Sequence, residues 1–194
     1  MRGASESLLV QVIKDERGAS LLEFAIVVPL LVVLVVGVYD FSLAFNQRQR
    51  IVQAAQEGAI VAGAQPMNDI QTTTSNPATL QPVLTAVFNS LATNGVLPNS
   101  GTSCTLSAPA PPTQLTWVYT IKNCSATYPS DNLVITINRG WYAGTGPVSV
   151  GTAVTVVYPY HWRFGSVIQL LIPGPNGYST AAQVSSTATV HNQI

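Results

Sequence analysis

The feature that most constrains this chain is an uncharged apolar run from Phe24 to Val38, which directly follows a glutamate, Glu23. With the two leucines before Glu23, the apolar stretch covers about 18 residues, or roughly 27 Å as a helix, which is close to the thickness of a bilayer core. A carboxylate beside a membrane span is energetically costly and therefore points to a function. The run predicts a membrane anchor, and Glu23 needs a role of its own.

A secretory signal peptide is the main alternative to an anchor. No Ala-x-Ala cleavage site follows the run, and residues 40–64 continue in a helical pattern, so we favour the anchor. Pro29 lies inside the run, but membrane helices tolerate proline because neighbouring groups satisfy the carbonyl that it frees. The segment before the span, Met1–Gly18, is short and mixed in charge. We interpret it as a cytoplasmic leader that is removed.

A helical pattern continues beyond the span and predicts one helix from Ala19 to Ala64, ending before Pro66. Polar residues occupy its other faces. We expect residues 65–77 to be a linker and 78–194 to form a domain outside the membrane. The apolar and small residues of the stripe, at intervals of three and four, are Phe41, Ala44, Phe45, Ile51, Val52, Ala55, Ala59 and Ala62.

Within the outer domain, a shorter helix is predicted from Ala78 to Thr93, closed by Asn94 and Gly95. Its apolar positions fall on one face, which we expect to pack on a sheet. These positions are Leu80, Val83, Leu84, Val87, Phe88 and Leu91.

Alternating apolar residues then predict four strands, separated by loops at Pro109–Pro112 and Gly140–Pro147. Such alternation favours an antiparallel sheet with one covered face. The predicted fold class is therefore α+β: a long transmembrane and amphipathic helix, then a small, mainly antiparallel sheet with one short helix. The alternating sets are Leu115, Trp117, Tyr119 and Ile121; Leu133, Ile135 and Ile137; Val154, Val156, Tyr158 and Tyr160; and Tyr178, Ala182, Val184, Ala188 and Val190, opposite Ser179, Gln183, Ser185, Thr187 and Thr189.

The chain has two cysteines, Cys104 and Cys124, in a region rich in Ser, Thr and Pro. They form no Cys-x-x-Cys pair, and no histidines stand at metal-ligand spacing. We expect a disulfide in an oxidising compartment, which places the C-terminal region outside the cytoplasm. Two unpaired, buried thiols are the alternative.

Charge is too sparse for several classes of function. The net charge is zero and only 8% of residues are charged. This excludes a basic nucleic-acid footprint and leaves little material for acid–base catalysis. The charged residues beyond Glu57 are Asp69, Lys122, Asp131, Arg139 and Arg163.

No catalytic motif stands out, and we assign no catalytic residue, metal site or cofactor. No serine lies in a Gly-x-Ser-x-Gly elbow, and Gly144-Thr145-Gly146 is interrupted by Pro147. His161 stands among aromatic residues, where a lone histidine is usually structural. We expect the chain not to be an enzyme.

An apolar patch at Phe164–Ile172 precedes Pro173-Gly174-Pro175. One interpretation is that the patch packs under a loop. The other is a contact with the membrane surface or a partner subunit, because exposed apolar patches often mark interfaces.

The segment from Arg17 to Leu30, Arg-Gly-Ala-Ser-Leu-Leu-Glu-Phe-Ala-Ile-Val-Val-Pro-Leu, resembles the opening of TadE-like proteins. These are pseudopilin-type minor components of bacterial tight-adherence (Flp) pilus systems. Residues Gln53–Ala59 resemble the small-residue helix end of that family. The strand Val154–Tyr160, followed by Ser185–Asn192, resembles its closing strands. No motif connects Pro66–Gly151 to the family.

The resemblance implies that a prepilin peptidase cuts between Gly18 and Ala19, recognising Gly18, Ala19, Glu23 and Phe24. Ala19 then becomes the N-terminus and Glu23 the fifth residue. The family pattern implies that Glu23 pairs with the Ala19 amine of a neighbouring subunit, which relieves the cost of burying its charge. Alternatively, Glu23 lies among headgroups or at the positive helix end, worth ~0.3 to 1 kcal/mol, and Gly18 is only a flexible joint.

Together these features predict a structural subunit of a tight-adherence pilus or related secretion apparatus. Its expected partners are the peptidase, other pilin-like subunits, the inner-membrane platform and the membrane. The expected location is the inner membrane, crossed once, with the N-terminus cytoplasmic and the domain periplasmic or carried into the pilus. The alternative is an uncleaved, membrane-anchored periplasmic binding module that contacts a glycan or protein through Trp117, Trp141, Tyr142, Tyr158, Tyr160 and Trp162.

Overall fold

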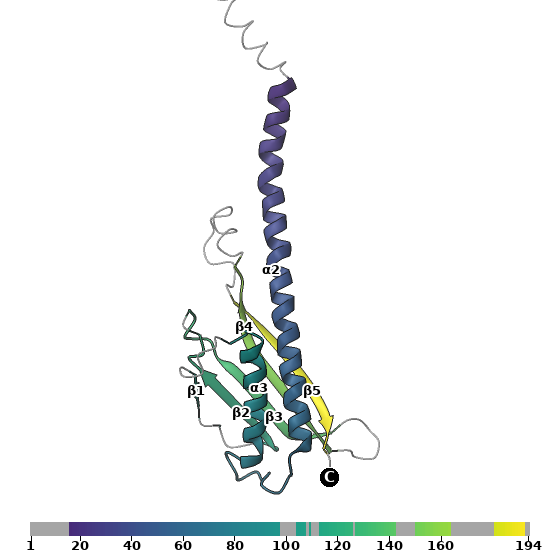
Figure 1. Ribbon diagram of the computed structural model, residues 1–194, viewed down its shortest axis with the longest axis vertical. Coiled ribbons are helices and arrows are strands. Elements are labelled where there is room, and N and C mark those ends of the chain that lie inside the picture. Colours follow the sequence, from purple (N-terminus) through teal and green to yellow (C-terminus); the bar gives the residue numbers. More distant parts are fainter. Residues whose placement is uncertain are drawn as a thin grey trace, which may run out of the picture. The chain divides into compact units, whose positions relative to one another are not determined.

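The computed structural model describes residues 16–97, 104–107, 109, 113–125, 127–142, 150–163 and 181–192 (Figure 1). Their helices and strands form two compact units, of which the first holds the beginning of the long helix, up to Ser42, and Arg163. The second unit holds the rest. In chain order the elements are α2 (Glu16–Ala64), η1 (Ala78–Leu80), α3 (Gln81–Thr93), β1 (Thr105–Leu106), β2 (Thr116–Lys122), β3 (Leu133–Tyr142), β4 (Val150–His161) and β5 (Ala181–His191).

The first part of α2 carries the predicted membrane segment. Its apolar side chains are largely exposed, including Leu21 at 72%, Phe24 at 67% and Leu30 at 67%. By length and composition α2 could cross a membrane, and Pro29 lies inside it. The predicted helix is confirmed, although it begins at Glu16 and not at Ala19.

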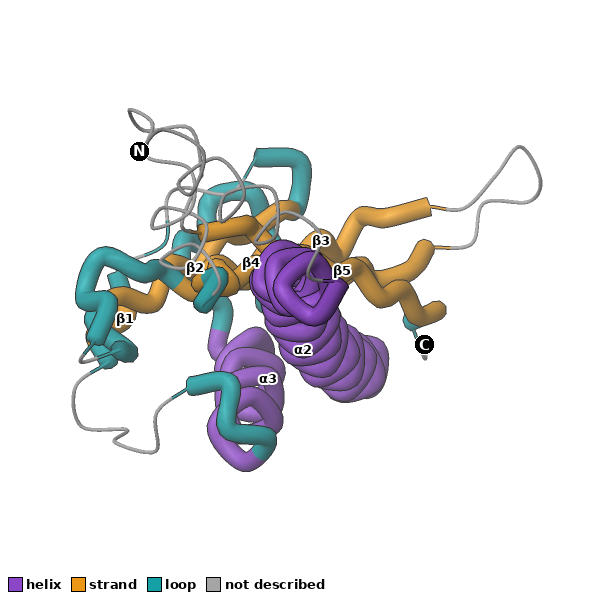
Figure 2. The backbone as a smooth tube through the Cα atoms, turned by 90° about the horizontal axis from the view of Figure 1, so that it is seen from above, coloured by secondary structure: helices purple, strands orange, loops and turns teal. Residues whose placement is uncertain are grey.

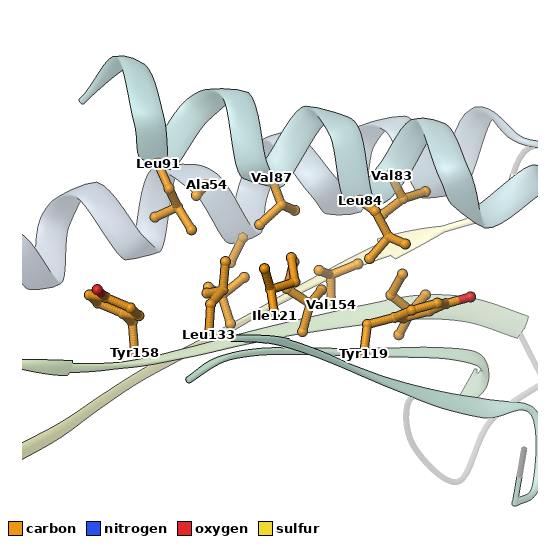
Figure 3. Close-up of a cluster of buried hydrophobic side chains, with 14 of the residues drawn as sticks. Ala54, Val83, Leu84, Val87, Leu91, Tyr119, Ile121, Leu133, Val154 and Tyr158 are labelled. Atoms are coloured by element: carbon orange, nitrogen blue, oxygen red, sulfur yellow. The ribbon is translucent and has the colours of Figure 1, made fainter. Parts of the chain in front are cut away.

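The second part of α2 packs on the sheet through small side chains. Ala54, Ala55 and Ala62 are fully buried, and a Cβ built on Gly58 would lie 2.4 Å from Val87 of α3 and 3.2 Å from Val154 of β4. Small residues on this face let α2 approach both α3 and the sheet closely. Figure 3 shows Ala54 of α2 and the apolar side chains of α3 facing those of the sheet.

The predicted second helix is confirmed as η1 followed by α3. All six predicted apolar positions face the core, five of them buried and Phe88 partly buried. Gly95 closes α3 with a left-handed backbone, φ 67°. Its N–H donates to Ala92 O at 3.0 Å and the N–H of Val96 donates to Leu91 O at 2.9 Å, which is the Schellman arrangement.

The five strands form an antiparallel sheet in the order β1-β2-β3-β4-β5. Figure 2 shows α2 and α3 on the same face of this sheet. Inward residues from β2, β3 and β4 alternate as predicted, and Trp117, Ile135 and Val154 are fully buried. The α+β fold class is confirmed.

Three details differ from the sequence prediction or fall beyond it. The short edge strand β1 was not predicted, because two residues carry no periodicity. The loop predicted from Gly140 is wrong at its start, since β3 continues through a register shift between Asn138 and Trp141 as far as Tyr142. Tyr178, Ser179 and the patch Phe164–Ile172 lie outside the described residues.

Candidate functional site

The predicted processing segment lies in the first turns of α2. Gly18 and Glu23 are exposed, and nothing lies within 4 Å of a Cβ built on Gly18. Ala19 and Glu23 are four residues apart, so they share one helix face with a rise of about 6 Å between them. The segment therefore presents Gly18, Glu23 and Phe24 on an open helix surface.

The start of α2 at Glu16 places Glu23 away from the N-terminal end of the helix. Since α2 begins at Glu16, Glu23 lies beyond the first turn, where the helix dipole stabilises carboxylates most. Dipole stabilisation is therefore weak in the uncut chain. A cut after Gly18 would shorten the helix and bring Glu23 to within about one turn of its new, cationic end.

The same start places the Gly18–Ala19 bond inside a helix. A bond in a regular helix must open before a protease can bind it in extended form. Terminal turns open at low cost because their first N–H groups have no partner within the helix. Gly18 lowers the free-energy cost of opening the helix further, by about 1 kcal/mol relative to an alanine at that position.

At the other end, α2 is held by a fully buried arginine, Arg139 of β3. Its guanidinium donates to the carbonyl oxygens of Ala62, of Gln65 at 2.8 Å and of Pro66 at 3.4 Å. It also donates to the Thr152 hydroxyl of β4 at 3.1 Å. Carbonyls at a helix C-terminus have no partner within the helix and carry partial negative charge. Arg139 thus fixes the end of α2 to the sheet.

Burial lowers the pKa of Arg139, against the opposing effect of the Asp69 charge. Arginine stays protonated even so. From the sequence, Arg139 stands out only as one of few charged residues. The signal was present, because Arg139 continues the inward-facing register of Leu133, Ile135 and Ile137.

The segment predicted as a linker, residues 65–77, is tied to the domain. The indole N–H of Trp117 donates to Thr74 O at 2.9 Å, and the Tyr119 hydroxyl bonds Asn76 Oδ1 at 3.1 Å. Burial, with a smaller effect of the Asp69 charge, raises the pKa of Tyr119 to about 12. Two core aromatic residues thereby fix the path of the chain between α2 and η1.

Asp69 stabilises the start of η1. Its carboxylate accepts the Thr79 N–H at 3.0 Å and the Thr79 hydroxyl at 2.5 Å. Burial alone would raise the pKa of Asp69, but hydrogen bonds, chiefly from Thr79, outweigh it and lower the pKa. The carboxylate therefore links residues 65–77 to the start of η1.

Cys104 and Cys124 form the expected disulfide, with Cα atoms 4.5 Å apart. It links the residue before β1 to the segment after β2. The short edge strand β1 is thereby held by a covalent bond.

His161 has the structural environment that the sequence suggested. Its Nε2 lies 2.8 Å from Asp131 Oδ2, and its ring stacks on Tyr128 with centroids 3.5 Å apart. Within the described part of the chain, no group of three His, Cys, Asp or Glu side chains could hold a metal. The cluster ties the chain before β3 to the end of β4.

Of the six aromatic residues proposed for a binding module, three are buried. Trp117 is fully buried, and Tyr158 and Tyr160 are exposed by only 5% and 7%. Trp141 and Trp162 are partly buried, and the side chain of Tyr142 lies outside the description. Three of the six residues therefore belong to the core and offer no surface to a ligand.

The family model for TadE-like proteins matches residues 18–59. The match begins at Gly18, includes Glu23 and the apolar run, and ends at Ala59, where α2 packs on the sheet. It confirms the resemblance over that segment and supports a role related to tight-adherence pili. Residues 154–160 and 185–192 lie outside it. No curated protein and no solved structure matches the chain.

Proposed function

We propose that this protein is a minor pilin-like subunit that acts structurally in assembly of a tight-adherence pilus or related secretion apparatus. It is anchored by α2 in the bacterial inner membrane, with the domain on the periplasmic side. A prepilin peptidase cuts between Gly18 and Ala19. The subunit catalyses nothing; other pilin-like subunits and the membrane platform are its partners.

One observation carries the proposal: Gly18, Ala19 and Glu23 stand at the start of the helix that the family model matches. An exposed apolar run follows directly. Within a bilayer such a surface is covered by lipid or by other helices. A lone carboxylate at its edge then gains most from a cationic partner, which the Ala19 amine of a neighbouring subunit would supply.

The domain supports a structural role outside the cytoplasm. Its disulfide is stable in an oxidising compartment such as the periplasm. The Arg139 guanidinium fixes the C-terminal end of α2 to the sheet, so this end of the helix and the domain are joined by side-chain contacts as well as by the chain.

The docking role is tested by replacing Glu23. We expect Glu23→Ala to insert in the membrane normally but to lose incorporation into the assembly, because the amine of the neighbour then has no carboxylate partner. Incorporation is measured by immunoblotting of sheared pili and of detergent-extracted complexes. Ser42→Ala, an exposed position on the same helix, is the matched control.

Two outcomes separate the possibilities. Normal incorporation of Glu23→Ala shows that the carboxylate does not dock subunits. Loss of incorporation in both Glu23→Ala and Ser42→Ala means that general helix packing, and not the charge, is being measured. The proposal predicts loss for Glu23→Ala alone.

A further inference from the structure

A groove lies between α2 and α3, which run side by side on one face of the sheet (Figure 2). Its volume is about 700 Å³, within the range of about 300 to 1,000 Å³ that sites for small ligands occupy. All residues of its lining belong to the second unit, so the shape of the groove does not depend on the membrane segment.

The lining of the groove consists mainly of side chains that both donate and accept hydrogen bonds. Four side-chain amides and the hydroxyls of Ser90 and Thr93 outnumber the two apolar residues, Ile60 and Ala86. An amide side chain carries the same donor and acceptor groups as a peptide unit. The lining therefore suits a ligand that contains amide groups, whereas an apolar ligand would leave these polar groups unpaired. The four amides belong to Gln53, Gln56, Asn89 and Asn94.

Ser90 carries a hydroxyl that has no partner. Among the described lining residues only Ser90 is buried, with 7% of its surface exposed. Its Oγ makes no hydrogen bond within the part of the chain that the structure describes. A hydroxyl on a helix often donates to the carbonyl four residues earlier, as Thr85 does to Gln81 O at 3.0 Å. A polar group of a ligand, directly or through one water, would satisfy the Ser90 hydroxyl.

Two opposite charges flank the groove. Glu57 belongs to its lining, and Arg50 Nη1 lies 3.9 Å from a Cβ built on Gly95, the residue after Asn94. Arg50 and Glu57 are seven residues apart, so they share one face of α2 and lie about 10.5 Å apart along its axis. Neither forms an ion pair with another described residue. Arg48 lies two positions before Arg50 and therefore on the other side of the helix.

We propose that this groove binds a short peptide with free, charged ends, extended along α2 with its amine at Glu57 and its carboxylate at Arg50. An extended chain covers about 3.3 to 3.6 Å per residue, so three residues span the ~10.5 Å between the two charges. The amide side chains of the lining pair with the peptide units of the ligand, and Ser90 gains a partner. This binding site goes beyond the proposed function, because the processing segment takes no part in it.

The positions of these groups determine how strongly each one contributes. Arg50 and Glu57 are exposed, so each ion pair with the ligand changes the affinity by no more than about fivefold. The hydrogen bond to the buried Ser90 changes it by about threefold to tenfold. Salt screens exposed charges, so binding should weaken as the ionic strength rises.

The test of the charges uses the full-length chain in lipid nanodiscs and trialanine as the probe, with the affinity measured by saturation-transfer NMR. We expect acetylation of the trialanine amine to weaken binding about threefold to fivefold in the parent but to have no effect in Glu57→Gln. Amidation of its carboxylate should weaken binding by a similar factor in the parent but have no effect in Arg50→Gln. Absence of trialanine binding, or acetylation that weakens binding equally in the parent and in Glu57→Gln, overturns the proposal.

Ser90→Ala separates binding from packing. We expect it to weaken trialanine binding by about threefold to tenfold without lowering the melting temperature, because the hydroxyl has no partner in the protein to lose. Asn46→Ala, at an exposed position of α2 outside the lining, is the control and should bind like the parent. A lower melting temperature with unchanged binding would show that Ser90 serves packing and overturn its assignment to the site.

Maltotriose, a short oligosaccharide without amides or charges, tests the class of ligand. We expect it to bind at least about threefold more weakly than trialanine, because it has no charged ends for Glu57 and Arg50. Tighter binding of maltotriose would assign the groove to a saccharide and overturn the proposal.

None of these measurements needs the peptidase or a pilus. A chain that is never cut but binds trialanine contradicts the proposed function and leaves this inference standing. A chain that is cut and assembled but does not bind trialanine does the reverse.

Discussion

Single residues determine how α2 joins the domain. Arg139 is fully buried, yet its charge is directed at helix-terminal carbonyls and not at a carboxylate. A planar guanidinium suits this arrangement because several N–H groups reach different acceptors at once. The residue is costly to bury and correspondingly costly to remove.

We expect Arg139→Leu to lower the free energy of unfolding by about 2 to 4 kcal/mol, because carbonyls at the end of α2 lose their donors. Arg139→Lys keeps the charge but lacks the planar guanidinium with its several N–H donors. We therefore expect it to lower the free energy of unfolding by less than Arg139→Leu. Denaturant unfolding of the detergent-solubilised chain, followed by circular dichroism, measures both. Arg48→Leu, at an exposed site of α2, is the control. Equal stability of Arg139→Leu and the parent would show that the Arg139 contacts with the end of α2 are dispensable.

Buried tyrosines predict an alkaline limit to stability. Burial raises the pKa of Tyr119 and of Tyr158 from 10.0 to about 12. The unfolded chain therefore loses these protons first, and stability should fall from about pH 10 until about pH 12. When unfolding is measured across this pH range, the free energy of unfolding should fall less steeply with pH in Tyr119→Phe than in the parent. Tyr39→Phe, at a 60% exposed site, should follow the parent. If the free energy of unfolding of Tyr119→Phe falls with pH as steeply as that of the parent, Tyr119 does not contribute to the alkaline loss of stability.

Among the elements, α2 is one continuous helix whose two parts differ in side-chain size and in burial. Its early positions are large, apolar and exposed, whereas the later positions facing the sheet are Ala54, Ala55, Gly58, Ala59 and Ala62. Small residues are needed there because α3 and the sheet both approach the helix. The family match ends within this second stretch.

Gly58 tests that close approach. A Cβ at this site lies 2.4 Å from Val87 Cγ2, a separation that packing does not tolerate. We expect Gly58→Ala to destabilise the domain, because overpacking of about 1 to 3 kcal/mol exceeds the gain of about 1 kcal/mol in helix propensity. Thermal unfolding compares it with Gly37→Ala, where nothing lies within 4 Å. A rise in stability for Gly58→Ala would refute the packing argument.

Periodicity predicted most elements, and non-local contacts account for what it missed. Leu133, Ile135 and Ile137 alternate, so β3 could be read locally, as could the apolar face of α3. The hydrogen bond from the Trp117 indole N–H to Thr74 O joins residues 43 positions apart. No local pattern in residues 65–77 predicts it. The role of Arg139 also depends on non-local contacts, because its acceptors at Ala62 and Gln65 lie 77 and 74 positions away in the sequence.

At the scale of the whole molecule, one chain combines a segment that the TadE-like family model matches, a membrane-length helix and a disulfide-bonded sheet domain. The processing segment is the part on which the proposed function depends most. Cleavage there would create the Ala19 amine and shorten α2 at the same time.

The N-terminus of the mature protein tests this most directly. The chain is recovered from membranes of cells with an active prepilin peptidase, and intact mass and N-terminal sequencing are measured. A Gly18→Leu chain is the matched variant, expected to stay uncut because a bulky side chain hinders close approach of the protease to the backbone. We predict that the parent begins at Ala19. A parent chain that begins at Met1 in those cells would contradict the account.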